Sequence, residues 1–231
     1  MSRLNQIRAA EAASHVEAYN TNALYAPGSW LAKPVKTVLD ILPLFEGRED
    51  LRALDLGRGV GRNSIPAARV FRRVDCVDIL DLAIEKLVEN AVNHGVGERI
   101  RGTVSAIDDY AIEAGGYDLI MAISALEHVA SEAFFIRKLA EIAAGIRKNG
   151  VVILVVNSGV RERDKRTGAA LEPQFEVNFD TEALQKLLHS VFTGWEILKE
   201  TVVHQCYDIP RETGVAELET DVVTWVARRS I

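Results

Sequence analysis

The residues most suited to chemistry in this chain form a glycine-rich loop. Gly57, Gly59 and Gly61 occupy alternate positions just after a short apolar run that contains Asp55. Glycine lets the backbone turn sharply and approach a ligand closely, and open α/β folds bind ligands at the carboxyl edge of a parallel sheet. The loop therefore predicts a site for a small polar cofactor. The alternative is a turn that only joins a strand to a helix.

The spacing of these glycines disfavours other nucleotide sites. A dinucleotide-binding fingerprint has glycines at its first, third and sixth positions, whereas these lie at the first, third and fifth. The sixth position is Arg62 when counted from Gly57, and Ser64 when counted from Gly59. No Gly-Lys-Ser or Gly-Lys-Thr follows, so the sequence has no P-loop here. A nicotinamide- or flavin-dependent oxidoreductase is therefore the poorer interpretation.

A second acid lies at the end of the next apolar run. Asp78 stands 17 residues beyond Gly61, close to where Rossmann-type sites place an acid for ribose hydroxyls. A carboxylate can accept two hydrogen bonds from a vicinal diol, which is the group that a ribose presents. We predict that Asp78 binds a ribose. The alternative is a solvated aspartate at a strand end, or a helix N-cap.

The elements that must position these residues follow from the spacing of apolar side chains. Short runs rich in branched residues predict strands at 51–56, 74–79, 100–104, 117–123 and 151–156. Apolar residues at steps of three and four predict helices near 35–42, 80–91, 135–146 and 184–191. Strands that alternate with helices predict a doubly wound α/β fold, with a parallel sheet between two helical layers.

The pattern changes towards the C-terminus. Residues 195–203 and 218–227 predict two antiparallel strands, joined by a turn region that contains Pro210 and Gly214. The polar stretch Ser158–Asn178 is long for a connection in a compact domain, and it predicts a functional loop or a partly disordered segment.

The composition limits the class of protein. With 231 residues, 48% of them hydrophobic, we expect one domain over 1–231, with an N-terminal extension or lid at 1–33 and a core at 34–231. The net charge of −6, without a basic block, predicts no nucleic-acid partner. No run is long and apolar enough for a signal peptide or a membrane span, so we expect no membrane partner. Two cysteines favour a reducing, cytoplasmic setting and no metal site, and the sequence leaves the oligomeric state open.

Taken together, Asp55, the three glycines and Asp78 resemble the class I S-adenosylmethionine-dependent methyltransferases. The resemblance covers about residues 35–229, because Tyr117–Ile120, Leu126–Val129 and Lys148–Val152 resemble that family's later motifs in the same order. It implies a Rossmann-like, doubly wound seven-stranded sheet, mostly parallel with a C-terminal antiparallel hairpin. It also implies S-adenosyl-L-methionine as cofactor, S-adenosyl-L-homocysteine as product and a small-molecule acceptor. Residues 175–200 resemble, more narrowly, the tellurite-resistance branch.

The resemblance also implies which residues would contact the cofactor. Asp55 and the loop of Gly57, Gly59 and Gly61 would line the methionine portion, and Asp78 would hold the ribose. The adenine would lie between Ile79 and Ile107, and residues 123–125, beginning with Ile123, would form the floor beneath the sulfonium. Ala106 stands where many members have an acid for the adenine amine, and the neighbouring Asp108 is a possible substitute.

One departure from the family suggests a different function. Arg58 stands where the family usually has a small residue or cysteine, and a guanidinium beside a sulfonium cation is unfavourable unless it points outward. Together with Ala106, it motivates an alternative, in which a degenerate methyltransferase fold binds a ligand or partner without catalysis.

Few residues are candidates for catalysis, because methyl transfer from a sulfonium needs alignment more than it needs a base. His128 and His204 are the candidate catalytic residues, each with a structural histidine as the alternative. Tyr19, Tyr25 and Trp30 predict an aromatic lid over the cofactor, with ordinary packing of an N-terminal extension as the alternative.

Overall fold

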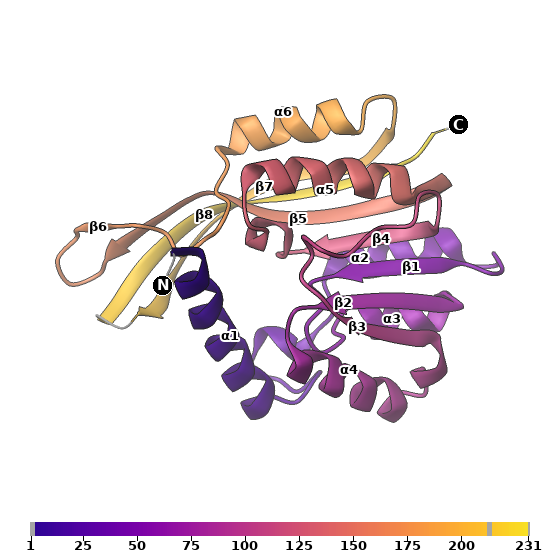
Figure 1. The fold of residues 1–231 in the computed structure, drawn as a ribbon, viewed down its shortest axis with the longest axis horizontal. Helices are drawn as coiled ribbons and strands as arrows, with labels where there is room; N and C mark the ends of the chain where they lie inside the picture. Colours follow the sequence, from indigo (N-terminus) through magenta and orange to yellow (C-terminus); the bar gives the residue numbers. More distant parts are fainter. Residues whose placement is uncertain (1–2, 212–213, 231) are drawn as a thin grey trace.

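The computed structural model describes residues 3–211 and 214–230, and their strands form one mixed sheet (Figure 1). The strand order is β3-β2-β1-β4-β5-β8-β7. The bounds are β1 Arg52–Leu56, β2 Arg73–Asp78, β3 Ile100–Val104, β4 Tyr117–Ile123, β5 Ile146–Asp164, β7 Glu196–Arg211 and β8 Gly214–Arg228. Strands β1 to β5 are parallel to one another, whereas β8 pairs antiparallel with both β5 and β7. The predicted Rossmann-like sheet with a C-terminal antiparallel hairpin is confirmed, with one short strand, β6 (Ala170–Leu171), added beside β5.

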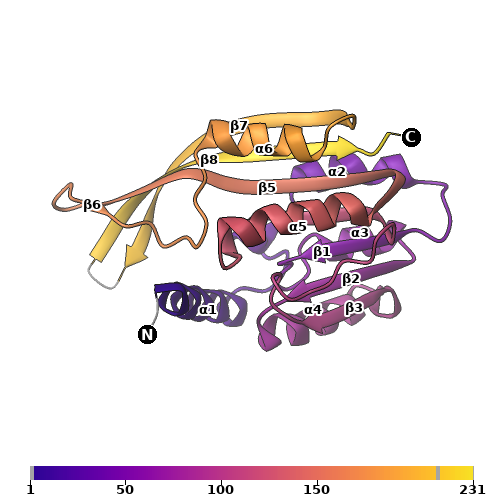
Figure 2. The same ribbon diagram turned by 45° about the horizontal axis from the view of Figure 1, so that its top comes forward.

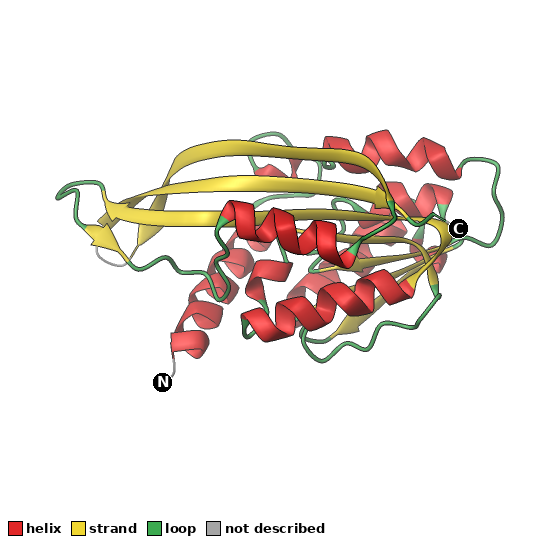
Figure 3. Ribbon diagram, turned by 90° about the horizontal axis from the view of Figure 1, so that it is seen from above, coloured by secondary structure: helices red, strands yellow, loops and turns green. Residues whose placement is uncertain are grey.

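Helices cover both faces of the sheet (Figure 3). The α-helices are α1 Arg3–Thr21, α2 Lys36–Ile41, α3 Ser64–Val70, α4 Asp81–Asn93, α5 Glu132–Gly145 and α6 Thr181–Val191. Short 3₁₀ turns are η1 Trp30–Ala32, η2 Leu42–Phe45, η3 Gly97–Arg99 and η4 Leu126–His128. Successive strand residues alternate between faces. Accordingly, Leu119 packs with the layer of α2 and α3, and Ile120 packs with that of α5 and α6.

Two predicted connections are shorter than expected. Part of the predicted polar loop at Ser158–Asn178 belongs to β5, and Pro210, predicted in a turn region, belongs to β7. Strands β5, β7 and β8 continue beyond the sheet as an antiparallel arm of residues 158–164, 204–211 and 214–221 (Figures 1 and 2). Ion pairs between neighbouring strands stabilise this arm, including the pair of Arg163 and Glu219 at 2.6 Å. Pro210 fits because β7 is an edge strand, where a missing N–H leaves no ladder partner unsatisfied.

Apolar and polar side chains of helix α1 are not separated onto distinct faces. Of its 19 residues only Ile7 and Tyr19 are buried, although it runs beside α4 and towards the arm (Figure 1). A helix without an apolar stripe gains little from packing along its length, so it depends on contacts near its ends: ion pairs in its N-terminal half and the buried ring of Tyr19 in its last turn. This helix forms most of the predicted N-terminal extension.

Candidate functional site

A cleft of about 750 Å³ opens at the carboxyl edge of β1, β2 and β4, with α1 along one side. It brings together eight of the nine residues that the sequence suggested for a cofactor. They are Asp55, Gly57, Gly59, Asp78, Ile79, Ala106, Ile107 and Ile123. The ninth, Gly61, lies outside the cleft lining. A Cβ on Gly61 would come within 2.6 Å of Leu87 Cδ1, so this glycine lets the loop pack against α4.

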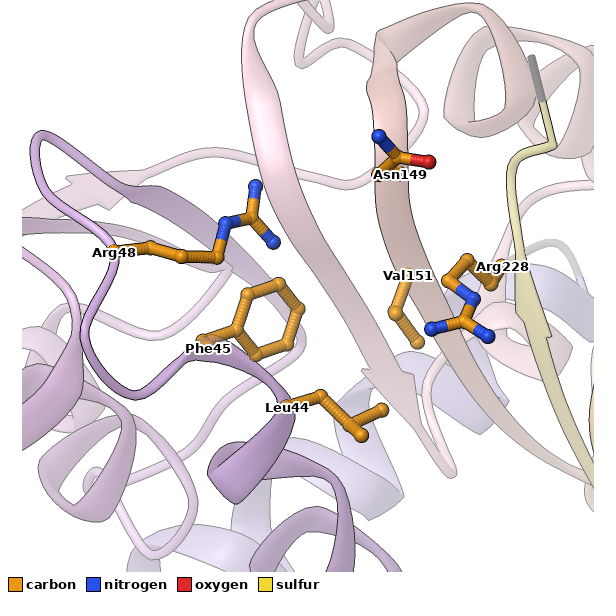
Figure 4. Close-up of a pocket in the computed structure, with 6 residues that line it drawn as sticks. All are labelled: Leu44, Phe45, Arg48, Asn149, Val151 and Arg228. Carbon is orange, nitrogen blue, oxygen red and sulfur yellow. The ribbon is translucent and has the colours of Figure 1, made fainter.

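A smaller cavity of about 260 Å³ lies near η2 and the start of β5 (Figure 4). Its two arginines are engaged by carboxylates, Arg48 by Asp118 at 3.0 Å and Arg228 by Glu196 at 2.5 Å. No acid or histidine lines it. This cavity therefore offers no side chain for acid–base chemistry.

Gly57 and Gly59 shape the loop because no larger residue fits. Gly57 has a φ of +65°, and a Cβ there would stand 2.4 Å from the Ala125 Cβ. Gly59 has a φ of +57°, and its Cβ would meet the Tyr19 hydroxyl at 2.6 Å. Positive φ values favour glycine, and the close approaches exclude a side chain. The loop thus leaves room for a ligand between β1 and α1.

Asp78 anchors the loop from the end of β2. Its Oδ2 accepts the Gly59 N–H at 2.8 Å, and its Oδ1 accepts the Leu80 N–H at 3.0 Å. The residue is 8% exposed and lines the cleft. Each carboxylate oxygen has a second lone pair, so Asp78 can bind a diol while it holds the loop.

Asp55 places a carboxylate at the base of the cleft. Ser64 donates its hydroxyl to Asp55 Oδ2 at 2.6 Å. Burial raises the pKa of Asp55 to about 6, although the Ser64 hydrogen bond and the Arg58 charge act in the opposite direction. At neutral pH it is therefore a buried anion, which attracts a cationic ligand.

Arg58 is buried beside the same loop. Its Nη1 donates to the carbonyl oxygens of Gly59 and, at 3.4 Å, of Ala83 in α4, whereas its Nε and Nη2 have no hydrogen-bond partner. The guanidinium thus reaches towards the start of α4. Asp108, the possible substitute at the adenine, is also engaged: it accepts Arg8 at 2.8 Å and the Ala130 N–H at 3.0 Å.

The other half of the cleft contains His128. Its Nδ1 lies 2.9 Å from Glu176 Oε2 and 3.0 Å from Glu11 Oε2, and its ring stacks on Phe175. Burial lowers the pKa of His128, but the two carboxylate contacts outweigh this and raise it to about 10. With a proton held at neutral pH, His128 is a poor general base in this state.

His204, the second candidate catalytic residue, is not brought to the cleft. It lies in the arm, where its Nδ1 is 3.0 Å from Asp221 Oδ1 and its side chain is 59% exposed. Sequence reasoning instead missed Glu11, Glu176 and Tyr207, which do line the cleft. Glu11 sits on a helix without periodicity and Glu176 in a polar connection, so neither carried a sequence signal.

Two of the three predicted lid aromatics reach the cleft. Tyr19 and Trp30 line it and pack with His15, at ring-centroid distances of 5.6 to 6.1 Å. Tyr25 does not line it: its hydroxyl donates to the Arg62 carbonyl at 2.9 Å, and its ring meets His94. Tyr19 in α1 and Trp30 in η1 thus lie at the cleft, and their role as a lid stays a prediction.

The N-terminal half of α1 is fastened by arginines. Arg3 pairs with Glu172 at 2.6 Å and donates to the Pro173 carbonyl at 2.9 Å. Arg8 bridges Asp108 at 2.8 Å and the His128 carbonyl at 3.3 Å. These contacts hold the N-terminal half of α1 across the cleft, whereas its C-terminal end packs through Tyr19 against Leu31, Val60 and Ala83.

Replacing Arg8 with alanine should therefore release α1 without unfolding the core. We expect amide hydrogen exchange of residues 3–21 to accelerate about 10-fold, which corresponds to a loss of about 1.4 kcal/mol of local stability. Exchange in β1 and β4 should stay unchanged. Mass spectrometry of exchanged peptides measures both, with Lys36→Ala, which breaks the exposed pair with Asp40, as the control. Uniform acceleration across the sheet would contradict this assignment.

Within the described residues, no helix is both long and apolar enough to cross a membrane.

Comparisons with known proteins agree with this geometry. Residues 53–150 match a family described as a methyltransferase domain. The chain is 36% identical over 89 residues to a ubiquinone biosynthesis O-methyltransferase of Methylocella silvestris, covering 38% of this chain and 34% of that protein. It is 33% identical over 96 residues to the protein of that name from Caulobacter sp., covering 42% and 38%. The matches thus span little more than a third of these relatives.

Solved structures share the fold over more of the chain. TehB from Haemophilus influenzae aligns with a TM-score of 0.63 and 18% identity, over 85% of this chain and 62% of that one. A 1,6-didemethyltoxoflavin-N1-methyltransferase from Burkholderia thailandensis aligns with a TM-score of 0.57 and 18% identity, over 100% and 92%. At these identities the likeness establishes the fold, and the tellurite-resistance branch stays a prediction. Residues 53–150 thus match a methyltransferase domain, and they lie within a Rossmann-like fold that solved methyltransferase structures share.

Proposed function

We propose that this protein transfers a methyl group from S-adenosyl-L-methionine to a small-molecule acceptor. The observation that carries the proposal is the convergence of eight cofactor candidates, from four separate stretches of sequence, on one cleft. The cleft also extends well beyond them, so that a second molecule can bind beside the first. The bound cofactor would supply an electrophilic methyl group on a sulfonium.

The residues of the chain would contribute binding and alignment. Asp78 would hold the ribose hydroxyls, Asp55 would attract the cationic methionine end, and Ile79 and Ile107 would flank the adenine. Helix α1 would exclude water from the reacting atoms. Methyl transfer is an in-line displacement with a neutral leaving group, so alignment and desolvation supply most of the rate enhancement.

The acceptor side of the cleft suits a small molecule with an apolar body. Phe175, Tyr207 and Val222 line it, together with the polar side chains of Asn157 and Gln205. Such a mixed, mostly preformed surface is typical of small-molecule sites. The two curated relatives are named for O-methylation in ubiquinone biosynthesis, and one solved structure for N-methylation. These names support a small acceptor for this chain.

Calorimetric titration of the protein with S-adenosylmethionine and S-adenosylhomocysteine tests the proposal. We expect micromolar dissociation constants, about −8 kcal/mol, and no binding of NADH. Arg58→Ser is measured in parallel. If the wild-type protein fails to bind and Arg58→Ser binds, Arg58 closes the site and the non-catalytic alternative is correct. If neither binds, the cofactor proposal is wrong.

The raised pKa of Asp55 predicts opposite pH trends for binding and stability. Because Asp55 takes up a proton below about pH 6, affinity for the cationic cofactor should fall about 10-fold between pH 7.5 and 5. The pKa of Asp55 is higher in the folded chain than in the unfolded chain. The free energy of unfolding should therefore rise by about 1 kcal/mol as the pH falls from 7.5 to 5.

The Asp55→Asn variant isolates this group from the others that titrate. Its affinity should be low at both pH values, and the difference in unfolding free energy between wild type and variant should change with pH by about 1 kcal/mol. Calorimetry and urea unfolding at pH 5 and 7.5 measure the two quantities. Identical pH profiles for wild type and variant would rule out Asp55 as the titrating group.

A further inference from the structure

Three side chains from distant parts of the sequence meet on the acceptor side of the cleft. Glu11 comes from α1, His128 from η4 and Glu176 from the connection between β6 and α6. One ligand atom from each lies within 4.8 Å of the other two. We propose that Glu11, His128 and Glu176 bind one divalent transition-metal ion, of the manganese, iron or zinc kind.

The distances already match those of a metal site. The Nδ1 of His128 stands 2.9 Å from Glu176 Oε2 and 3.0 Å from Glu11 Oε2. Neighbouring ligands at right angles around an ion, each about 2.1 Å from it, are separated by about 3.0 Å. The Glu11 and Glu176 oxygens can therefore each occupy a coordination position next to that of the His128 nitrogen.

Hydrogen bonding alone leaves this cluster incompletely satisfied. The Nδ1 of His128 carries at most one proton, yet two carboxylate oxygens approach it. Glu176 Oε1 accepts no hydrogen bond, although the side chain is only 1% exposed, and the nearest cation, Arg8 Nε, is 3.7 Å away. A buried carboxylate oxygen without a donor is costly. A metal ion would satisfy Glu176, which can bind through one or both oxygens.

The charges in this region favour a divalent ion. Glu11 and Glu176 place two negative charges at His128, while Arg8 pairs with Asp108 at 2.8 Å and lies farther from Glu176, at 3.7 Å. An ion of charge +2 would replace the proton that His128 holds, and it would balance the two carboxylates beside a neutral imidazole. The donor set of two carboxylates and one imidazole suits manganese, iron or zinc better than calcium, which prefers oxygen ligands alone.

Three protein ligands leave coordination positions open, as in catalytic metal sites. The open side would face the cleft, so a hydroxyl group of the acceptor could bind the ion there; this step rests on the proposed function. A metal-bound hydroxyl ionises more readily and releases its proton to solvent. The oxygen then forms the new bond to the methyl carbon as the bond from that carbon to sulfur breaks. The site thus points to an acceptor that is methylated on oxygen.

Electron paramagnetic resonance titration with Mn²⁺, on protein without an affinity tag, tests the site in the absence of cofactor. We expect one ion per chain at micromolar concentration, displaced by Zn²⁺. Glu11→Gln and Glu176→Gln keep the side-chain shape and should each weaken binding at least 10-fold, and His128→Ala should abolish it. The matched control is His189→Ala, which removes a histidine paired with Glu200 at 3.1 Å outside the cleft.

The metal titrations have outcomes that would overturn the proposed site. Absence of both Mn²⁺ and Zn²⁺ binding, or equal binding by wild type and all three variants, would overturn it. Melting temperatures of the metal-free variants show whether each one folds, and Glu11 lies on a partly exposed helix face that tolerates the exchange. Bound Mn²⁺ should also accelerate water-proton relaxation, which reports the open positions. Cofactor binding is measured separately without metal, so that failure of the metal site and failure of the proposed function are distinguished.

Discussion

Replacing Asp78 with alanine should weaken binding of S-adenosylmethionine and S-adenosylhomocysteine about 100-fold. The wild-type carboxylate is proposed to accept hydrogen bonds from two ribose hydroxyls, and bonds to a charged group contribute about 1.5 kcal/mol or more each. Their loss corresponds to about 3 kcal/mol of binding free energy. The same carboxylate accepts the N–H groups of Gly59 and Leu80, so the loop beneath the cofactor is expected to loosen as well. Calorimetric titration measures the change in affinity.

Two further variants test the role of the Asp78 charge. Asp78→Asn keeps the shape and one acceptor oxygen, but its NH2 group would face the N–H of Gly59 or Leu80, so it should melt below the wild type and lose at least 10-fold in affinity. Asp81→Asn, three residues later on the exposed start of α4, removes a nearby negative charge outside the cleft and should leave affinity unchanged. Wild-type affinity in Asp78→Asn would show that Asp78 acts on the loop alone.

The core of the fold could be predicted from the sequence because its signals are local. The strands β1, β2 and β4 are buried on both faces and therefore appear as continuous apolar runs. The residues at their ends, such as Gly57 and Asp78, meet at one edge because parallel strands share a direction. The position of the cofactor candidates thus followed from topology once the strands were recognised.

The rest of the site depends on contacts that local patterns do not encode. Helix α1 has no apolar stripe, and Glu11 reaches the cleft because distant residues hold the helix there, through ion pairs of its arginines and the packing of Tyr19. The arm is stabilised by ion pairs between β5, β7 and β8. When the sequence is considered alone, these charged residues have the pattern of a polar loop. Gly61 matches the motif but lies outside the cleft lining, where its lack of a side chain lets the loop pack against Leu87.

Replacing Gly57 with alanine should destabilise the protein by about 3 kcal/mol and abolish cofactor binding. A φ of +65° costs a residue with a side chain about 1–2 kcal/mol, and the new Cβ would stand 2.4 Å from the Ala125 Cβ, which adds about 1–3 kcal/mol of overpacking. Gly95→Ala is the matched control. Its φ is +71° but its Cβ would meet nothing within 4 Å, so only the backbone cost of about 1 kcal/mol applies.

The double variant Gly57→Ala with Ala125→Gly isolates the clash, because it removes the atom that the new Cβ would strike. We expect it to be about 1–3 kcal/mol more stable than the sum of the two single effects, as measured by urea unfolding in a double-mutant cycle. Additive effects, or a Gly57→Ala cost equal to that of Gly95→Ala, would mean that Gly57 and the floor residue Ala125 are not in close contact in solution. A positive coupling would instead establish that the loop closes directly onto the floor on which the sulfonium is proposed to rest.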